Sequence, residues 1–178
     1  QGLNTAITTF EPVDIMKTSK TLDSEENISI TADIENWLND TEITLTHRNV
    51  TKIGLDQIFI TPDIEIKNEN RSDEIKVYHD AGDVLRKWDE ILIVAEEQQG
   101  KTSLLKYHYK DQLIKGYLPL YINGIDIKKS NAEDIITKQL KKQYKNLNYQ
   151  DYIESERAIL LLDNIDQIVL NPKYRDLL

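Results

Sequence analysis

The pattern of apolar and polar positions changes near residue 90 of this 178-residue chain. Beyond this point, uninterrupted apolar runs at 91–94, 118–122 and 158–162 predict three strands that are buried on both faces. Apolar residues at helical spacing fill both intervals between these runs. Strands that alternate with helices predict a parallel α/β sheet with right-handed crossover connections.

The two predicted helices have recognisable ends. The first is expected at 101–115, and Gly116 supplies the residue that ends it. Ser130 and Glu133 have the spacing of a capping box that opens the second. The expected inward positions are Leu104, Leu105, Tyr109 and Leu113 in the first helix, and Ile135, Ile136, Leu140, Tyr144 and Leu147 in the second.

The N-terminal stretch has weaker periodicity. Residues 1–27 are polar and follow no clear period. Residues 31–39 predict a short helix with Thr31 as its N-cap. Alternating apolar and polar positions at 42–46 predict a strand. The face expected to be apolar on the short helix consists of Ile34, Trp37 and Leu38.

Between this stretch and residue 90 the chain has three further segments. Residues 53–60 are apolar and are followed by Pro62, and 66–74 predict a charged loop. Residues 80–88 predict a helix that Asp80 caps. The apolar stripe of that helix is expected to consist of Val84, Leu85 and Trp88.

Composition and charge narrow the function classes. Hydrophobic residues make up 39% and charged residues 30%, which is typical of a globular protein rather than a disordered one. The net charge of −9 argues against general binding to nucleic acid or to an anionic membrane. The charge is divided unevenly: residues 1–99 carry 21 acidic and 9 basic side chains, and residues 100–178 carry 10 and 13. We therefore expect the two parts to do different jobs, and the phosphate site proposed below lies in the second.

The sequence also bears on location and extent. No apolar run reaches the roughly 18 residues that cross a bilayer, and no signal-peptide pattern opens the chain. Cysteine is absent, so disulfides and thiolate metal sites are excluded. We expect a cytoplasmic protein. The chain begins at Gln1 and stops at Leu178 shortly after an Asn-Pro pair, so we expect a piece of a larger protein.

A phosphate-binding motif lies between the first predicted strand and the first predicted helix. The segment AEEQQGKT, residues 95–102, matches the Walker A pattern G-x-x-x-x-G-K-[ST] with Ala95 at the first glycine position. Gly100 lets the backbone turn its N–H groups toward phosphate oxygens, and Lys101 adds a positive charge. The Thr102 hydroxyl is a ligand for Mg²⁺. The expected phosphate site is Ala95, Glu96, Glu97, Gln98, Gln99, Gly100, Lys101, Thr102 and Ser103.

A Walker B pattern follows in the third predicted strand. ILLLD ends in Asp163, whose carboxylate emerges at the carboxyl end of the strand and is expected in the Mg²⁺ shell with Thr102. Many ATPases of the additional-strand class have a catalytic glutamate directly after this aspartate, where this chain has Asn164. Asp166 is then the candidate that orients the attacking water or assists the metal, and Asp166 and Lys101 are the expected catalytic residues. The alternative for Asp166 is a helix N-cap.

Together these motifs resemble the signal-transducing NTPases called STAND, which include NACHT and NB-ARC domains. The resemblance covers about residues 50–170 and rests on AEEQQGKTSLL and LLLDNID. The family's Walker B continues as D-x-h-D-E, with h apolar, and Gln167 replaces the final acid. Before the phosphate loop the family places residues that pack on adenine, which implies Phe59 and Pro62 here, together with Ile58 and Ile60; plain core packing is the alternative for each.

The resemblance implies a truncated three-layer P-loop NTPase domain at 51–178, with a parallel sheet, preceded by a small mixed α/β extension or linker at 1–50. It also implies ATP or ADP with Mg²⁺ as cofactors and a switch within a larger bacterial signalling or antiviral defence protein. That protein would oligomerise when triggered and would contain further domains. In this family one more strand, expected beyond Leu178, lies between the Walker A and Walker B strands, so hydrolysis by this chain alone is expected to be weak or absent.

Two other classes remain open. A nucleotide-independent scaffold with a degenerate phosphate loop is conceivable because of Ala95, Asn164 and Gln167. A P-loop kinase or GTPase would place the Walker A and Walker B strands side by side. A GTPase should also carry an N-K-x-D motif, and the segment at 171–174 reads NPKY instead.

Overall fold

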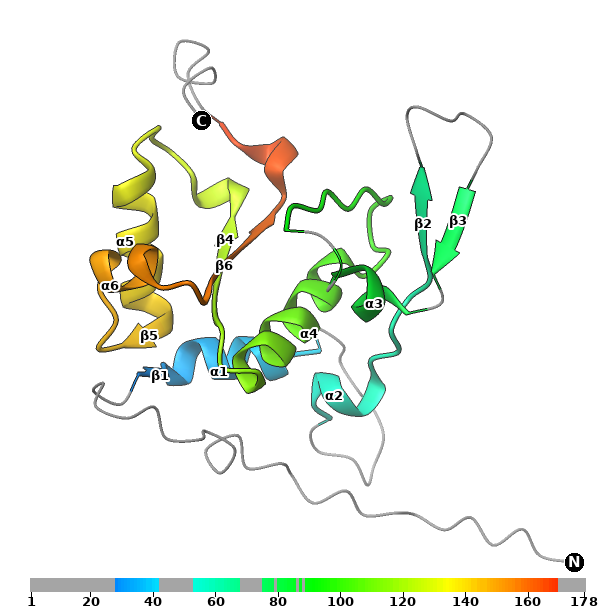
Figure 1. The fold of residues 1–178 in the computed structure, drawn as a ribbon, viewed down its shortest axis with the longest axis horizontal. Coiled ribbons are helices and arrows are strands. Elements are labelled where there is room, and N and C mark those ends of the chain that lie inside the picture. The colour runs from blue at the N-terminus through cyan, green and yellow to red at the C-terminus, as the bar shows by residue number, and fades with distance from the viewer. Residues whose placement is uncertain are drawn as a thin grey trace, which may run out of the picture.

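The centre of the fold is a pair of parallel strands. The structure is a computed structural model, and it describes residues 28–41, 53–67, 75–78, 80–85, 87 and 89–169. Strand β4 (Leu118–Asn123) pairs in parallel with β6 (Ala158–Asp163), in a register that runs from Leu118 opposite Ala158 to Asn123 opposite Asp163 (Figure 1). This pairing confirms an α/β fold with parallel strands and two of the three predicted strands.

One face of the strand pair packs on helix α5 (Ala132–Gln143). Alternate residues of β4 point to this side, because successive side chains of a strand lie on opposite faces. The short helix α6 (Tyr149–Glu154) adds Tyr152 to the same cluster. The buried members of this cluster are Leu118, Leu120, Ile122, Ile127, Leu140, Tyr144, Leu147 and Tyr152.

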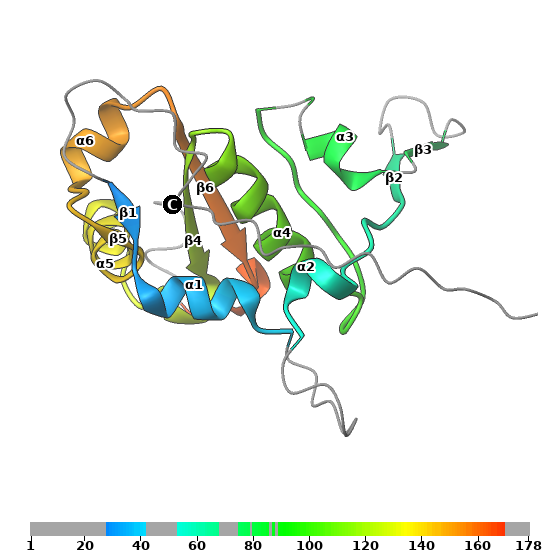
Figure 2. The ribbon, with the colours of Figure 1, turned by 90° about the horizontal axis from the view of Figure 1, so that it is seen from below.

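The opposite face packs on helices α4 (Lys101–Ile114) and α1 (Ala32–Asn39). Here Leu161 of β6 forms one buried cluster with Ile34 and Leu38 from α1 and Tyr109 from α4. Figure 2 shows the two strands between α5 on one side and α4 on the other. Helices therefore cover both faces of β4, which gives three layers.

The predicted strand at 91–94 is wrong. These residues run without strand pairing, and Leu92 and Val94 are 76% and 84% exposed. A strand is stable only when a neighbouring strand edge satisfies its backbone hydrogen bonds. In the described part of the chain, β6 pairs with β4 and with no second strand. An apolar run by itself does not supply that edge.

The expectation that the β6 run is buried on both faces is also wrong. Leu160 and Leu162 are 47% and 39% exposed, although Leu161 is 7% exposed. Both exposed leucines lie on the same face as Leu120 and Ile122 of β4, their partners in the register. Helix α5 contacts β4 on this face, and no described element covers β6 there in the same way.

The segment 28–41 belongs to the same packed unit. Strand β1 (Ser29–Ile30) pairs antiparallel with β5 (Tyr144–Lys145), directly after α5. The predicted N-cap of α1 is confirmed, because the Thr31 hydroxyl accepts from Ile34 N. The same hydroxyl donates to Lys142 O at 2.6 Å, and the Thr31 N–H donates to Gln143 O at 2.9 Å. These bonds join the start of α1 to carbonyls at the end of α5, which lack helical partners. The domain division at residue 50 stays a prediction.

The described residues between 53 and 85 form four small elements, of which the first contacts α4. They are helix α2 (Leu55–Ile58), the antiparallel strands β2 (Ile64–Lys67) and β3 (Ile75–Tyr78), and helix α3 (Ala81–Leu85). The first two residues of the loop predicted at 66–74 belong instead to β2, and residues 68–74 lie outside the described residues. Asp80 lies before α3 as predicted, and its carboxylate accepts from Gly82 N at 2.7 Å. The predicted strand at 42–46 and the side chain of Trp88 lie outside the described residues.

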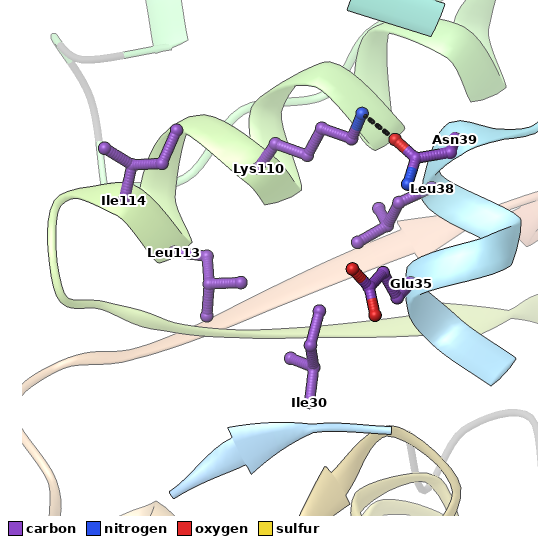
Figure 3. Close-up of a pocket in the computed structure, with 7 residues that line it drawn as sticks. All are labelled: Ile30, Glu35, Leu38, Asn39, Lys110, Leu113 and Ile114. Atoms are coloured by element: carbon purple, nitrogen blue, oxygen red, sulfur yellow. Dashed lines mark hydrogen bonds between the residues drawn. The ribbon is translucent and has the colours of Figure 1, made fainter. Parts of the chain in front are cut away.

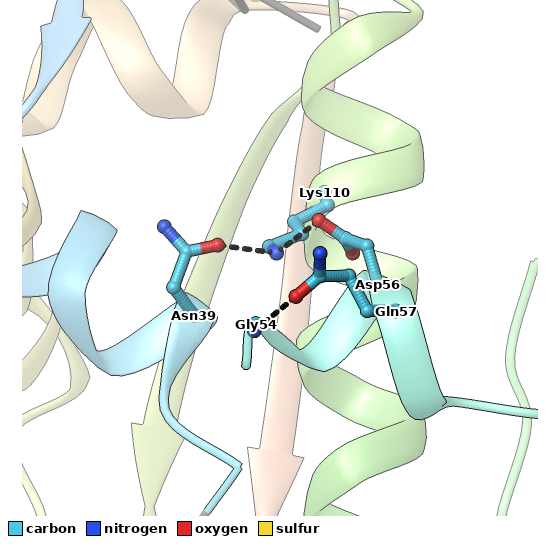
Figure 4. Close-up of polar contacts among 5 residues, drawn as sticks. All are labelled: Asn39, Gly54, Asp56, Gln57 and Lys110. Carbon is cyan, nitrogen blue, oxygen red and sulfur yellow. Dashed lines mark hydrogen bonds and ion pairs between the residues drawn. The ribbon is translucent and has the colours of Figure 1, made fainter. Parts of the chain in front are cut away.

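Lys110 ties these elements to the core. Its ammonium donates to Asn39 Oδ1 of α1 at 2.7 Å and to Asp56 Oδ2 of α2 at 2.8 Å (Figure 4). The side chain of Lys110 is only 8% exposed. A buried ammonium needs such acceptors, so α1 and α2 both meet α4 at this point.

The helix ends agree only in part with the sequence signals. Gly116 ends α4 at a φ of 85°, in the left-handed region that glycine tolerates. The predicted capping box at Ser130 is wrong, because Asn131 is the N-cap of α5 and its side chain accepts from Glu133 N and Asp134 N. No helix in the described part of the chain is long and apolar enough to cross a membrane.

Candidate functional site

The loop before α4 is closed on its own lysine. Lys101 Nζ donates to Ala95 O and to Glu96 O, both at 2.7 Å, and so holds the start of the loop near its end. The Glu96 N–H donates to the side-chain oxygen of Gln99 at 3.1 Å. These acceptors are neutral carbonyls, so an incoming anion could replace them and form stronger hydrogen bonds with the Lys101 ammonium.

Two residues of the loop have a left-handed backbone conformation. Gln98 has a φ of 62° and Gly100 a φ of 79°, both in the left-handed region. Gly100 is the N-cap of the 14-residue helix α4 and has no side chain to accept from the first turn. The first N–H groups of a helix have no internal partner and carry its positive dipole end. The loop can therefore receive an oxyanion at the start of α4.

Thr102 and Asp163 meet directly across the site. Thr102 Oγ1 donates to Asp163 Oδ2 at 2.7 Å, although the two residues are 61 positions apart. Asp163 is 5% exposed and ends β6, and Thr102 stands in the first turn of α4. The contact places two oxygen-bearing side chains at the carboxyl end of the parallel strands, where ligands bind in open α/β sheets.

The Asp163 carboxylate has two more donors. Tyr121 OH, from β4, reaches the same oxygen Oδ2 at 3.2 Å, and Asn164 N donates to Oδ1 at 2.9 Å. Both oxygens of this buried group are therefore hydrogen-bonded, as a buried carboxylate requires.

The chain turns sharply just after Asp163. Asn164 has a φ of 51°, and its side chain donates to Asn123 Oδ1 at 3.3 Å. A Cβ atom at Gly124 would lie 2.2 Å from Asn164 O, so only glycine allows this approach. The short turns that follow each strand, η2 (Gly124–Asp126) and η3 (Ile165–Gln167), are thereby packed together.

The structure places the remaining predicted residues as follows. Asp166 lies exposed in η3. The N-cap of η3 is Asn164, so the alternative role of Asp166 as a helix N-cap is wrong. Glu96, Glu97, Gln98 and Gln99 are exposed, whereas Ser103 lies partly buried in the first turn of α4. The phosphate-binding role of the loop and the catalytic role of Asp166 stay predictions.

The segment predicted to contact adenine packs beside α4. The Phe59 ring stacks on Tyr107 of α4, with centroids 4.9 Å apart and planes 27° apart. Pro62 is exposed, and its carbonyl accepts from Ala81 N at 3.1 Å. Ile60 is 86% exposed. Phe59 therefore has an aromatic neighbour of its own, and contact of this segment with a purine stays a prediction.

Two cavities accompany these elements. The one in Figure 3, between α1 and α4, has about 10 Å³ and lies beside Leu38 and Lys110. That volume suits about one water molecule. A second, open groove of about 180 Å³ lies between α1 and α5, with Trp37 and Tyr121 among its lining residues. Within the described residues no three His, Cys, Asp or Glu side chains gather into a metal-binding group.

Sequence reasoning missed two residues of this site. Tyr121 binds the Asp163 carboxylate, and Gln143 binds the backbone of Tyr121. The Gln143 side chain accepts from Tyr121 N at 3.0 Å and donates to Tyr121 O at 2.6 Å, so it pairs with β4 as a neighbouring strand would. The only available signal was alternation in LPLYIN, which puts Tyr121 and Asn123 on one face.

Comparisons with known proteins add no relative. No protein-family model matches the chain, and no curated protein or solved structure matches it either.

Proposed function

We propose that this chain is an ATP-binding, Mg²⁺-dependent P-loop NTPase module that acts as a nucleotide-controlled switch in a larger signalling or defence protein. The observation that carries the proposal is the 2.7 Å hydrogen bond from Thr102 to Asp163. It joins the last residue of the Walker A pattern to the acid of the Walker B pattern. Such a pair is what a P-loop uses to hold its metal ion.

The residues of the chain would act as follows. Lys101 would exchange the carbonyls of Ala95 and Glu96 for the β- and γ-phosphates, a change from neutral to charged acceptors that strengthens its hydrogen bonds. The N–H groups of the loop and of the first turn of α4 would bind further phosphate oxygens.

The oxygen set fits a magnesium ion. Mg²⁺ prefers oxygen ligands and usually keeps several waters, with one or two protein groups and the substrate phosphates completing its shell. Thr102 Oγ1 can donate its proton to Asp163 and keep its lone pairs for the ion. Bound Mg²⁺ would neutralise phosphate charge. Asp166 is exposed and follows Asp163 closely in the sequence, and it stays the candidate to orient the attacking water.

Nucleotide binding can bias larger movements through the contacts of α4. The helix that begins at the loop also packs on α1 and binds α2 through Lys110. A ligand shifts a conformational equilibrium only by its difference in affinity for the two states. If the contacts of α4 with α1 and α2 differ between the nucleotide-bound and nucleotide-free conformations, nucleotide binding would shift the balance between those conformations.

The proposal is tested by equilibrium binding of ATP with Mg²⁺ to the wild type and to Thr102→Val. The matched control is Thr137→Val, because Thr137 is also a partly buried helical threonine but lies on α5. We expect Thr102→Val to bind ATP·Mg²⁺ at least about tenfold more weakly, since a hydrogen bond to a charged group and a metal ligand are lost together. Thr137→Val should bind like the wild type.

Competition with GTP separates the nucleotide classes. Preferential displacement of ATP by GTP would favour a GTPase over the proposed ATP module. A folded wild type that binds neither nucleotide would instead favour the scaffold alternative.

A further inference from the structure

The hydroxyl of Tyr121 is a second side-chain donor to the carboxylate of Asp163. Tyr121 lies on β4, opposite Leu161 in the parallel register and two residues before Asn123, the partner of Asp163. Its hydroxyl reaches Oδ2 at 3.2 Å, the oxygen that also accepts from Thr102 at 2.7 Å. The carboxylate is thus held from the helix on one side and from the neighbouring strand on the other.

The ring of Tyr121 is itself held by α1. The Trp37 ring lies 4.3 Å from it, centroid to centroid, with the planes 37° apart. The Lys106 ammonium lies 4.9 Å from the Trp37 centroid and donates to Asp40 O at 3.0 Å. Lys106 is only 2% exposed. A buried cation over an indole face fixes the position of the ring.

The backbone of Tyr121 is fixed as well. Both of its polar groups bind the side-chain amide of Gln143, which is 3% exposed. Neither the main chain nor the ring of Tyr121 can therefore move without breaking contacts with α5 or α1. A group held in this way can orient its hydrogen-bond acceptor in turn.

We propose that Tyr121 is a positioning residue that orients the Asp163 carboxylate for Mg²⁺, and that Trp37 of α1 holds the Tyr121 ring in this role. The proposal rests on the function proposed above. It links docking of helix α1 to metal loading, because Trp37 of α1 packs on the ring whose hydroxyl binds the carboxylate. Partners that orient a metal-binding carboxylate lower the cost of ordering it when the ion arrives.

The main variant is Tyr121→Phe, which removes the hydroxyl and keeps the ring against Trp37. The matched control is Tyr152→Phe. Tyr152 OH also donates to β6, to Ile159 O at 2.9 Å, but four residues away from Asp163. ATP affinity is measured across a Mg²⁺ titration and again with the metal chelated. The chelated arm reports phosphate binding by Lys101 and the loop without the metal.

For Tyr121→Phe we expect a rise of about tenfold in the Mg²⁺ midpoint, the Mg²⁺ concentration that gives half of the full gain in ATP affinity. Tenfold is the lower end of the loss in metal affinity when such a partner is removed. The ATP affinity of this variant with the metal chelated should equal that of the wild type. Tyr152→Phe should leave both values unchanged. A general loss of structure would lower both arms together, so the difference between them isolates the positioning role.

The link to α1 is tested by a double-mutant cycle with Trp37→Leu. This variant should raise the Mg²⁺ midpoint about threefold in the wild type and have no effect on the midpoint in the Tyr121→Phe background, since it acts through the hydroxyl. An equal effect of Trp37→Leu in both backgrounds would overturn the link.

The outcomes separate this inference from the proposed function. A wild type whose ATP affinity responds to Mg²⁺, with an identical response in Tyr121→Phe, overturns the inference alone. A folded wild type without Mg²⁺-dependent ATP binding overturns both.

Discussion

Thr102 Oγ1 and Asp163 Oδ2 lie 2.7 Å apart and share a hydrogen bond, although 61 residues separate them in the chain. One stands at the start of α4 and the other at the end of β6. The bond brings the carboxyl end of the parallel pair against the start of α4. The proposed metal site depends on that contact.

Gly124 is expected to be intolerant of a side chain. Gly124→Ala would put a methyl group 2.2 Å from Asn164 O, so the turn after Asp163 must shift. We expect a loss of about 1–3 kcal/mol in unfolding free energy, measured by urea denaturation. Gly54→Ala is the control, since nothing lies within 4 Å of a Cβ atom there, and it should cost less than about 1 kcal/mol. Equal losses in the two variants would refute the close approach.

Gln143 is expected to contribute more to stability than its position at a helix end suggests. Gln143→Leu leaves both backbone groups of Tyr121 without their side-chain partner. The expected loss is about 2–4 kcal/mol, because each buried unsatisfied group costs about 1–3 kcal/mol. Denaturation of Gln150→Leu provides the comparison: Gln150 is exposed on α6, and its variant should stay within about 0.5 kcal/mol of the wild type. A Gln143→Leu protein as stable as Gln150→Leu would contradict this role.

Three buried tyrosines predict alkaline unfolding. Burial raises the pKa of Tyr109, Tyr144 and Tyr152 above the ordinary value, and for Tyr144 the neighbouring Tyr109 adds to the effect. In the unfolded chain these phenols ionise near about pH 10. Their contribution to stability is therefore complete below about pH 10 and is lost as the pH rises further.

The measurement is unfolding free energy against pH, followed together with tyrosinate absorbance. Each buried tyrosine should steepen the decline above about pH 10 by up to about 1.4 kcal/mol per pH unit. Tyr144→Phe should decline less steeply than the wild type over that range. The same slope in both proteins would show that Tyr144 is not shielded.

Local signals in the sequence predicted much of the fold. The helix α1 begins after Thr31 because its hydroxyl accepts from Ile34 N, and Gly116 ends α4 because glycine tolerates a positive φ. The runs that became β4 and β6 were recognisable because a strand between helices is apolar along its length. Each of these signals acts within a few residues.

The errors arose where distant contacts decide. The run at 91–94 is as apolar as β6, but it has no strand beside it in the described structure. Tyr144 and Leu147 continue the helical spacing of α5, yet the helix ends at Gln143, because Tyr144 is extended and pairs with β1. Pairing and packing overrode a correct local period.

The candidate site divides in the same way. The spacing of the Walker A and Walker B patterns pointed to Thr102 and Asp163, and the structure brings them together. Tyr121 could not be found in this way, because the register of β4 against β6 decides which strand side chains reach the carboxylate. Register is set by packing and turns across the whole sheet.

Thermal melting with and without ATP·Mg²⁺ tests the central claim most directly, in the wild type, in Lys101→Ala and in Lys138→Ala. Lys138 is an exposed lysine on α5 and controls for loss of one positive charge. At a ligand concentration of 100 times Kd, the wild type and Lys138→Ala should gain about 2.7 kcal/mol of stability, and Lys101→Ala should gain none. A wild type that melts cooperatively at the same temperature with and without ATP·Mg²⁺, or an equal gain in Lys101→Ala, would contradict a nucleotide site at this loop.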